Sequence, residues 1–140
     1  MQLQVQKLHP EAKMPAFAHD TDAGLDLCTV VAVTVEPGER MQIPTGLALA
    51  IPDGYVGLIW DKSGVSQKGG LKSFGGVIDA GYRGELFVGL LNTSDTAHTF
   101  AIGAKIAQIL IQKVEHPELV EVSSLDATPR GDGAFGSTGI

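Results

Sequence analysis

Residues 25–35 read Leu-Asp-Leu-Cys-Thr-Val-Val-Ala-Val-Thr-Val, and the sequence Glu36-Pro37-Gly38-Glu39 follows them directly. β-Branched side chains crowd this stretch, and such side chains favour an extended strand over a helix. Proline and glycine stand in the next segment where a reverse turn accepts them. The stretch therefore predicts one strand that ends at a tight turn.

Short apolar segments bounded by turn residues recur along the rest of the chain. Residues 3–8 alternate apolar and polar side chains, the period-two pattern of a half-buried strand. Further strands are predicted over 47–51, 55–60 and 105–114, one short helix over 63–69, and a β-hairpin over 76–88 in which Gly81 supplies a positive φ. We therefore predict an all-β domain, a sandwich, jelly roll or barrel.

Composition agrees with this fold class and excludes several kinds of protein. The 140 residues suit a single domain, and the 18 glycines and 7 prolines disfavour long helices. The single cysteine, Cys28, excludes an intrachain disulfide and a cysteine-rich zinc site. A net charge of −6 argues against general binding to nucleic acid. Because no signal-peptide pattern or membrane-spanning apolar run occurs, we expect a cytoplasmic protein without membrane contact.

The last part of the chain differs in composition from the rest. We predict a folded domain over 1–125 and a mobile C-terminal arm over 126–140, because the arm is small, polar and rich in glycine. The arm contains Arg130-Gly131-Asp132-Gly133-Ala134-Phe135-Gly136-Ser137-Thr138-Gly139. Closely spaced backbone N–H groups and a guanidinium favour an anion, and an aromatic ring outside any core can cover a nucleobase. The alternative is a flexible linker without function.

Three other segments contain side chains that can do chemistry. Asp61-Lys62-Ser63-Gly64 lies where a strand gives way to a helix, which suits either a phosphate or an ordinary helix cap. Asp79 precedes Ala80-Gly81 and is either a turn residue or a carboxylate that orients a water molecule. Asp26 lies within a strand pattern and is either an edge charge or a metal ligand. Each segment taken alone is a weak signal.

Taken in order, these segments form a recognisable set. The set is Asp-Ala-Gly-Leu-Asp-Leu (22–27), Lys-Ser-Gly (62–64), Gly-Val-Ile-Asp-Ala-Gly-Tyr-Arg-Gly-Glu (76–85), Ile-Ala-Gln-Ile-Leu (106–110) and the glycine-rich arm (130–139). It resembles the five motifs of the trimeric dUTP diphosphatases (dUTPases) in order and approximate spacing over nearly the whole chain.

The resemblance implies a fold, an assembly and a reaction. The fold would be a distorted jelly roll or β-barrel, and the assembly a homotrimer with active sites shared between subunits, each arm completing a neighbouring site. The reaction would be the Mg²⁺-assisted attack of water on the α-phosphate of dUTP, which yields dUMP and pyrophosphate. It would keep uracil out of DNA and supply dUMP for thymidylate synthesis.

The resemblance also implies a role for each matching residue. Asp79 would be the catalytic residue that activates the water, Tyr82 would lie against the deoxyribose, and Asp26 would hold Mg²⁺ through coordinated waters. The phosphate chain would contact Lys62, Ser63, Gly64, Gln108, Arg130, Gly136 and Ser137, and the nucleoside would contact Ser73, Gly76, Val77, Ile78 and Phe135. A strand backbone that matches the uracil edge would reject cytosine, because each unpaired polar atom costs about 1–3 kcal/mol.

Four positions depart from the family pattern. Lys62 stands where arginine is usual and loses the planar, bidentate fork of that side chain. Asp61 replaces the common proline and brings a negative charge next to Lys62. Ser73 stands where many members have asparagine, and Ala134 replaces a frequent glycine beside Phe135.

Two alternatives remain at this stage. A dCTP deaminase of the same superfamily, including a bifunctional one, would carry an Arg-Ser-Ser pattern where this chain has Lys-Ser-Gly at 62–64. A non-catalytic trimeric β-module that binds a ligand would explain the fold but not the glycine-rich arm.

Overall fold

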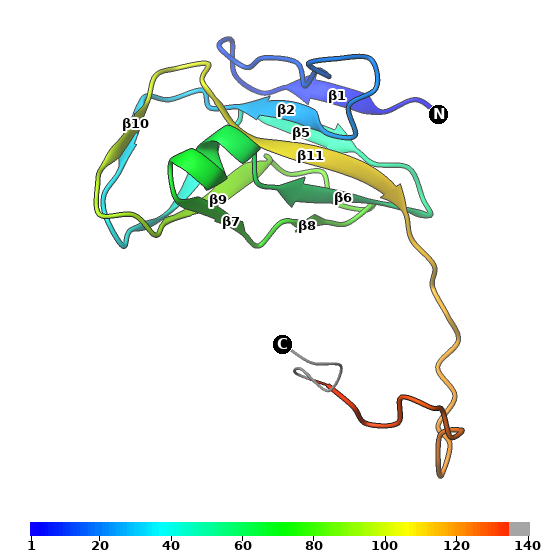
Figure 1. The fold of residues 1–140 in the computed structure, drawn as a ribbon. Coiled ribbons are helices and arrows are strands. Elements are labelled where there is room, and N and C mark those ends of the chain that lie inside the picture. Colours follow the sequence, from blue (N-terminus) through cyan, green and yellow to red (C-terminus); the bar gives the residue numbers. More distant parts are fainter. Residues whose placement is uncertain (135–140) are drawn as a thin grey trace.

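The computed structural model describes residues 1–134, which consist mainly of short β-strands and connecting loops (Figure 1). The elements are β1 (Gln4–Lys7), β2 (Leu25–Cys28), β3 (Val33–Val35), β4 (Arg40–Pro44), β5 (Leu47–Ala50), β6 (Tyr55–Trp60), the short π-type helix η1 (Gly64–Lys68), β7 (Leu71–Phe74), β8 (Val77–Ile78), β9 (Phe87–Asn92), β10 (His98–Phe100) and β11 (Lys105–Lys113). The predicted all-β class with one short helix is confirmed.

Antiparallel sheets stack into a jelly-roll-like body. A four-stranded sheet has the order β2-β11-β6-β8, a three-stranded sheet has the order β4-β9-β7, and β1-β5 and β10-β3 form separate pairs. Side chains from the sheets meet in one core, which includes the fully buried Leu27, Ile43, Leu47, Val88, Ile106 and Ile109. Among residues 1–134 the sheets do not close into a barrel.

The single strand predicted over 25–35 is wrong, because the chain bends after Cys28. The Thr29 hydroxyl donates to the carbonyl of Val31 at 2.8 Å and accepts from the Val31 N–H at 3.1 Å. Such local side-chain bonds compete with ladder pairing. As a result β2 pairs with β11, whereas β3 pairs with β10.

The predicted β-hairpin over 76–88 is also wrong. Strand β8 pairs with β6 through Gly57↔Ile78 and Leu58↔Val77, whereas β9 pairs with β4 and β7. Positive φ occurs at Gly75 (63°), and Gly81 is not among the glycines with positive φ. The reason is a tertiary contact: the Gly76 carbonyl accepts a 2.7 Å hydrogen bond from Ile59, which draws this segment onto β6.

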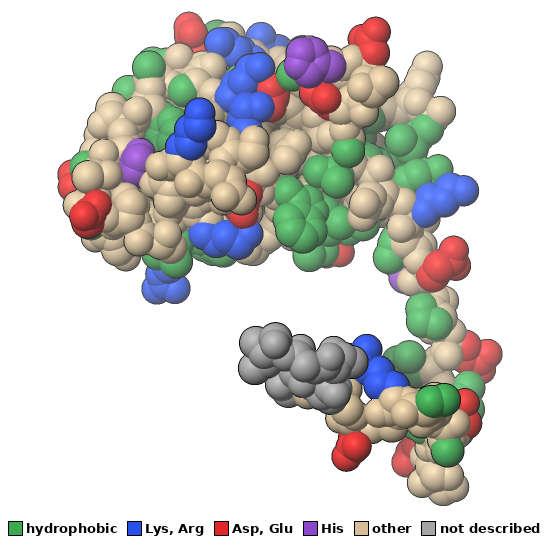
Figure 2. Space-filling view, in the orientation of Figure 1, with side chains coloured by type: hydrophobic (Ala, Val, Ile, Leu, Met, Phe, Trp, Pro, Cys, Tyr) green, Lys and Arg blue, Asp and Glu red, His purple; other side chains and the backbone are tan. Residues whose placement is uncertain are grey.

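The C-terminal segment leaves the body after β11. The N–H of Val114 donates to the carbonyl of Gly54 at 3.0 Å, and residues 115–134 are then almost all exposed. Figures 1 and 2 show this segment standing apart from the sheets. Within the described part of the chain, no helix has the length and apolar character needed to cross a membrane.

Candidate active site

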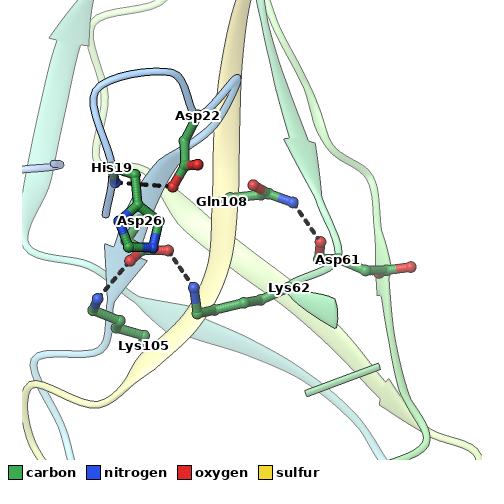
Figure 3. Close-up of polar contacts among 7 residues, drawn as sticks. All are labelled: His19, Asp22, Asp26, Asp61, Lys62, Lys105 and Gln108. Carbon is green, nitrogen blue, oxygen red and sulfur yellow. Dashed lines mark hydrogen bonds and ion pairs between the residues drawn. The ribbon is translucent and has the colours of Figure 1, made fainter. Parts of the chain in front are cut away.

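Asp26 lies at the centre of a polar cluster at one end of the largest sheet (Figure 3). Asp26 is only 7% exposed, and its backbone N–H donates to the carbonyl of Ala16 at 2.9 Å. Lys62 Nζ donates to Oδ1 at 2.7 Å, and Lys105 Nζ lies 2.6 Å from Oδ2. Burial raises the pKa of the Asp26 carboxyl, but the contacts with Lys105 and Lys62 outweigh it and hold that pKa below its ordinary value.

The second oxygen of Asp26 is held by Lys105. Lys105 Nζ lies 2.6 Å from Oδ2 as an ion pair, and this contact contributes to the lowered pKa of the carboxyl. Residues 1–134 contain no group of three or more His, Cys, Asp or Glu side chains placed to hold a metal ion. The donor set fits Mg²⁺ only in hydrated form: a single buried carboxylate, already paired with two lysines, would contact the ion through its waters, which Mg²⁺ readily keeps.

Gln108 joins the cluster from β11, directly opposite Asp26 in the strand register. Its Nε2 donates to the backbone carbonyl of Asp61 at 2.8 Å. Gly24 makes room for this side chain, because a Cβ at Gly24 would lie 2.2 Å from Gln108 Oε1. Gly24 was missed as a functional position by the sequence analysis, although it stands inside the Asp-Ala-Gly-Leu-Asp-Leu motif.

The carboxylate of Asp61 turns away from Lys62 (Figure 3). Oδ1 accepts a 2.6 Å hydrogen bond from the Ser73 N–H, and Oδ2 lies 2.5 Å from Lys72 Nζ. Burial raises the pKa of Asp61, but Lys72 and Ser73 outweigh it and lower that pKa. Lys72 and Ser73 of β7 therefore compensate the negative charge of Asp61, and Lys62 pairs with Asp26 instead.

Ser63 and Gly64 stand at the start of η1, beside Lys62. Ser63 occupies the N-cap position, but its side chain makes no capping hydrogen bond, so the helix-cap interpretation does not account for it. The space around Gly64 is open, since a Cβ there would meet no atom within 4 Å. Both residues are exposed and accessible to a ligand.

A second group of predicted site residues lies along β8 and the turn that follows it. Val77, Ile78, Asp79 and Tyr82 line one cleft of about 340 Å³, together with Gln42, Gly75, Glu85 and Phe87, whereas the predicted Gly76 lines a neighbouring cleft of about 210 Å³. Asp79 begins a turn closed by the Tyr82 N–H, which donates to the Asp79 carbonyl at 3.1 Å. The Tyr82 hydroxyl donates to the Glu85 carbonyl at 2.9 Å and holds the ring over Gly84.

The described chain thus brings the predicted residues together in two groups. Asp26, Lys62 and Gln108 do not line the cleft of Asp79 and Tyr82. Ser73 donates its backbone N–H to Asp61 and lines the cleft of about 210 Å³ that also includes Gly76 and Val77. Arg130 is exposed in the separate C-terminal segment, where its Nε donates to the Gly133 carbonyl at 3.0 Å. Phe135, Gly136 and Ser137 lie outside the described residues.

Known proteins resemble this chain over almost its entire length. The family model for dUTPase matches residues 10–139. The deoxyuridine 5′-triphosphate nucleotidohydrolase of Mycolicibacterium gilvum is 49% identical over 145 residues, which cover 98% of this chain and 94% of the relative. The protein of the same name from Rhodococcus erythropolis is 46% identical over 142 residues, covering 99% and 87%.

Solved structures agree with the sequence comparisons. A mutant dUTPase of Staphylococcus bacteriophage 80alpha with dUpNHpp has a TM-score of 0.93 and 35% identity, covering 99% of each chain. A mutant dUTPase from phage phi11 of S. aureus, described with a structural Mg(II) ion, has a TM-score of 0.82 and 35% identity, covering 89% of this chain and 98% of that one. The fold and the sequence define a nucleotide hydrolase. The chain belongs to the dUTPase family, as the motif resemblance predicted.

Proposed function

We propose that this chain hydrolyses dUTP to dUMP and pyrophosphate, which keeps uracil out of DNA and supplies dUMP for thymidylate synthesis. The observation that carries the proposal is the convergence of Asp26, Lys62 and Gln108 at one end of the β2-β11-β6-β8 sheet, in a chain of the dUTPase family.

The Asp26 group forms the phosphate end of the proposed site. Lys62 supplies a positive charge, Gln108 an amide, and Ser63 with Gly64 an accessible hydroxyl and backbone at the start of η1. Asp26 would hold Mg²⁺ through its waters, and the ion when bound would neutralise charge on the phosphate chain. Phosphoryl transfer depends mainly on positioning and charge neutralisation, and these residue types provide both.

The Asp79 group forms the nucleoside end and supplies the base. In our proposal Asp79 takes a proton from water, the water oxygen bonds to the α-phosphorus, and the bond from that phosphorus to the bridging oxygen breaks to release pyrophosphate. Tyr82 lies against the deoxyribose, while the backbone from Gly76 to Ile78 and the Ser73 side chain face uracil. The hydrogen bond from Ile59 to Gly76 fixes this backbone against β6, which supports a rigid base pocket.

We infer a homotrimer whose active sites combine groups from different subunits. The separation of the Asp26 group from the cleft of Asp79 supports this assembly, because one site would need both groups. The C-terminal segment stands apart from its own body, which supports the delivery of Arg130 and of Phe135, Gly136 and Ser137 to a neighbouring subunit. We place the enzyme in the cytoplasm, since Cys28 is a buried, unpaired thiol of the kind a reducing compartment preserves.

Pyrophosphate release from the purified protein tests the proposed reaction. The assay compares dUTP, dCTP, dTTP and UTP, each with Mg²⁺ and with a chelator. We expect rapid release from dUTP with Mg²⁺ and little from the other nucleotides. Release of ammonia from dCTP would favour the deaminase alternative, and the absence of any turnover would favour a binding module. Light scattering coupled to gel filtration tests the trimer.

A further inference from the structure

A β-bulge begins the strand that carries Gln108. In the pairing of β11 with β2, Lys105 lies opposite Cys28, whereas Ala107 lies opposite Leu27, so Ile106 is one extra residue on β11. A bulge changes which face of the sheet the following side chains occupy, and bulges near active sites often redirect a side chain.

This bulge brings Lys105 to the same face as Asp26. In a regular strand, residues 105 and 108 would point to opposite faces, because successive side chains alternate. With one extra residue between them, Lys105 and Gln108 share the face that Asp26 occupies on β2. Ile106 is fully buried, while the Lys105 side chain is 52% exposed and extends its Nζ to within 2.6 Å of Asp26 Oδ2.

The two lysines hold Asp26 in different ways. Lys62 stands in the loop before η1, next to Ser63 and Gly64, and donates a well-directed hydrogen bond to Oδ1. Lys105 extends from the start of β11 and forms a 2.6 Å ion pair with Oδ2. A buried carboxylate that lost both cations would be strongly destabilised, whereas one that keeps Lys105 remains compensated.

We propose that Lys105 is a positioning residue for the phosphate end of the site: it holds Asp26 through Oδ2, so that Lys62 can leave Oδ1 for the phosphate chain. This role rests on the proposed function. Asp26 would then keep one lysine in place while it held a hydrated Mg²⁺. The bulge at Ile106 is the backbone feature that makes this arrangement possible.

The test measures how strongly Mg²⁺ promotes nucleotide binding to the full chain. Calorimetry gives the Kd of dUpNHpp, the nucleotide in the phage structure, with Mg²⁺ and with a chelator. In Lys105→Gln, Lys62 is the only cation left on Asp26 and stays there, so binding without Mg²⁺ weakens, while hydrated Mg²⁺ replaces the missing charge. The Kd ratio is the Kd with chelator divided by the Kd with Mg²⁺. We expect this ratio to be about fivefold or more higher in Lys105→Gln than in the wild type.

Three control variants separate this role from a general loss of structure. Lys105→Arg keeps the positive charge and should show the wild-type Kd ratio. Lys113→Gln removes a lysine from the other end of β11 and should leave the Kd ratio unchanged. In an Asp26→Asn background, Lys105→Gln should have no further effect on the ratio, because the carboxylate charge is gone. A merely structural role would change the melting temperature and both Kd values together, without changing their ratio.

Two outcomes overturn the proposed role of Lys105, and only one of them also overturns the proposed function. If wild-type protein binds dUpNHpp and hydrolyses dUTP, but Lys105→Gln leaves the Kd ratio unchanged or lowers it, only the role of Lys105 is wrong. If wild-type protein neither binds dUpNHpp nor hydrolyses dUTP, the proposed function and the role of Lys105 are both wrong.

Discussion

Oδ1 of Asp61 accepts a 2.6 Å hydrogen bond from the backbone N–H of Ser73, and this bond ties the loop before η1 to β7. Asp61 stands where the family commonly has proline, a residue that restricts the backbone through its ring. Here a carboxylate restricts the loop by a tertiary contact instead. The carbonyl of the same residue accepts a hydrogen bond from Gln108, so Asp61 connects residues proposed for the base and for the phosphates.

We expect Asp61→Asn to weaken the dependence of folding stability on acid pH. Because the pKa of Asp61 is lower in the folded protein than in the unfolded chain, its stabilisation is present above the unfolded pKa of about 4 and is lost as the pH falls through the folded value. The effect should not exceed about 1 kcal/mol, since Lys72 is largely exposed. Denaturant unfolding between pH 6 and about pH 2.5 measures it.

Asp95→Asn, at an exposed loop position, is the control for this measurement. Protein concentration is kept constant, because subunit assembly contributes to apparent stability. Identical pH profiles for Asp61→Asn and wild type would show that the contacts of Asp61 with Lys72 and Ser73 do not persist in solution.

Asp79→Asn should nearly abolish turnover and leave dUTP binding almost unchanged. An amide cannot accept the proton of the attacking water, and loss of a general base costs about 10²- to 10⁴-fold in kcat. Single-turnover hydrolysis and calorimetry with dUpNHpp separate the two quantities. Asp53→Asn is a matched control, because Asp53 shares a neighbouring cleft of about 540 Å³ with Asp79 but does not line the 340 Å³ cleft of Asp79 and Tyr82. Full activity in Asp79→Asn would refute the proposed role.

Deletion of residues 130–140 should reduce kcat/KM sharply and leave the melting temperature nearly unchanged. Within residues 130–134, the observed hydrogen bonds connect the segment only to itself and to Thr128, so its removal takes little from the folded body. Differential scanning calorimetry and pyrophosphate release check both parts, with Arg130→Gln as the variant that removes only the guanidinium. A large loss of thermal stability would show that the arm contributes to the folded core.

UTP should be a much poorer substrate than dUTP, because in the proposed site the Tyr82 ring lies against the deoxyribose and would exclude a 2′-hydroxyl. Tyr82→Ala should lower the preference for dUTP, measured as kcat/KM for dUTP divided by kcat/KM for UTP. Tyr82→Phe should largely keep the ratio, since it retains the ring and loses only the 2.9 Å hydrogen bond to Glu85. Comparable rates for UTP and dUTP in the wild type would exclude this assignment of Tyr82.

Gly24→Ala should impair catalysis through Gln108. The new Cβ would lie 2.2 Å from Gln108 Oε1, so the side chain must shift and lose its hydrogen bond to Asp61. Loss of that bond corresponds to about 1 kcal/mol, or roughly a fivefold to tenfold decrease in kcat/KM. Gln108→Ala gives the reference effect, and the double variant should be no worse than Gln108→Ala alone. An additive loss would show that Gly24 acts by another route.

Local patterns in the sequence predicted most of the secondary structure and the family. The alternating segment at residues 3–8 and the apolar segment at residues 55–60 became strands, because side-chain periodicity and backbone preference act over a few residues. The glycines around residues 63–69 limited the helix to η1. The five ordered motifs identified the dUTPase family, which the comparisons confirmed. The roles assigned to individual site residues remain predictions.

Long-range pairing decided what these patterns left open. The choice of β6 rather than β9 as the partner of β8, and the bulge at Ile106 that turns Lys105 toward Asp26, depend on residues far apart in the chain. The same holds for the contact of Asp61 with Ser73 and for the place of Gly24 beside Gln108. A short segment encodes its own preferred conformation, but packing of the whole core selects its neighbours, and those neighbours set the direction and charge of each side chain in the site.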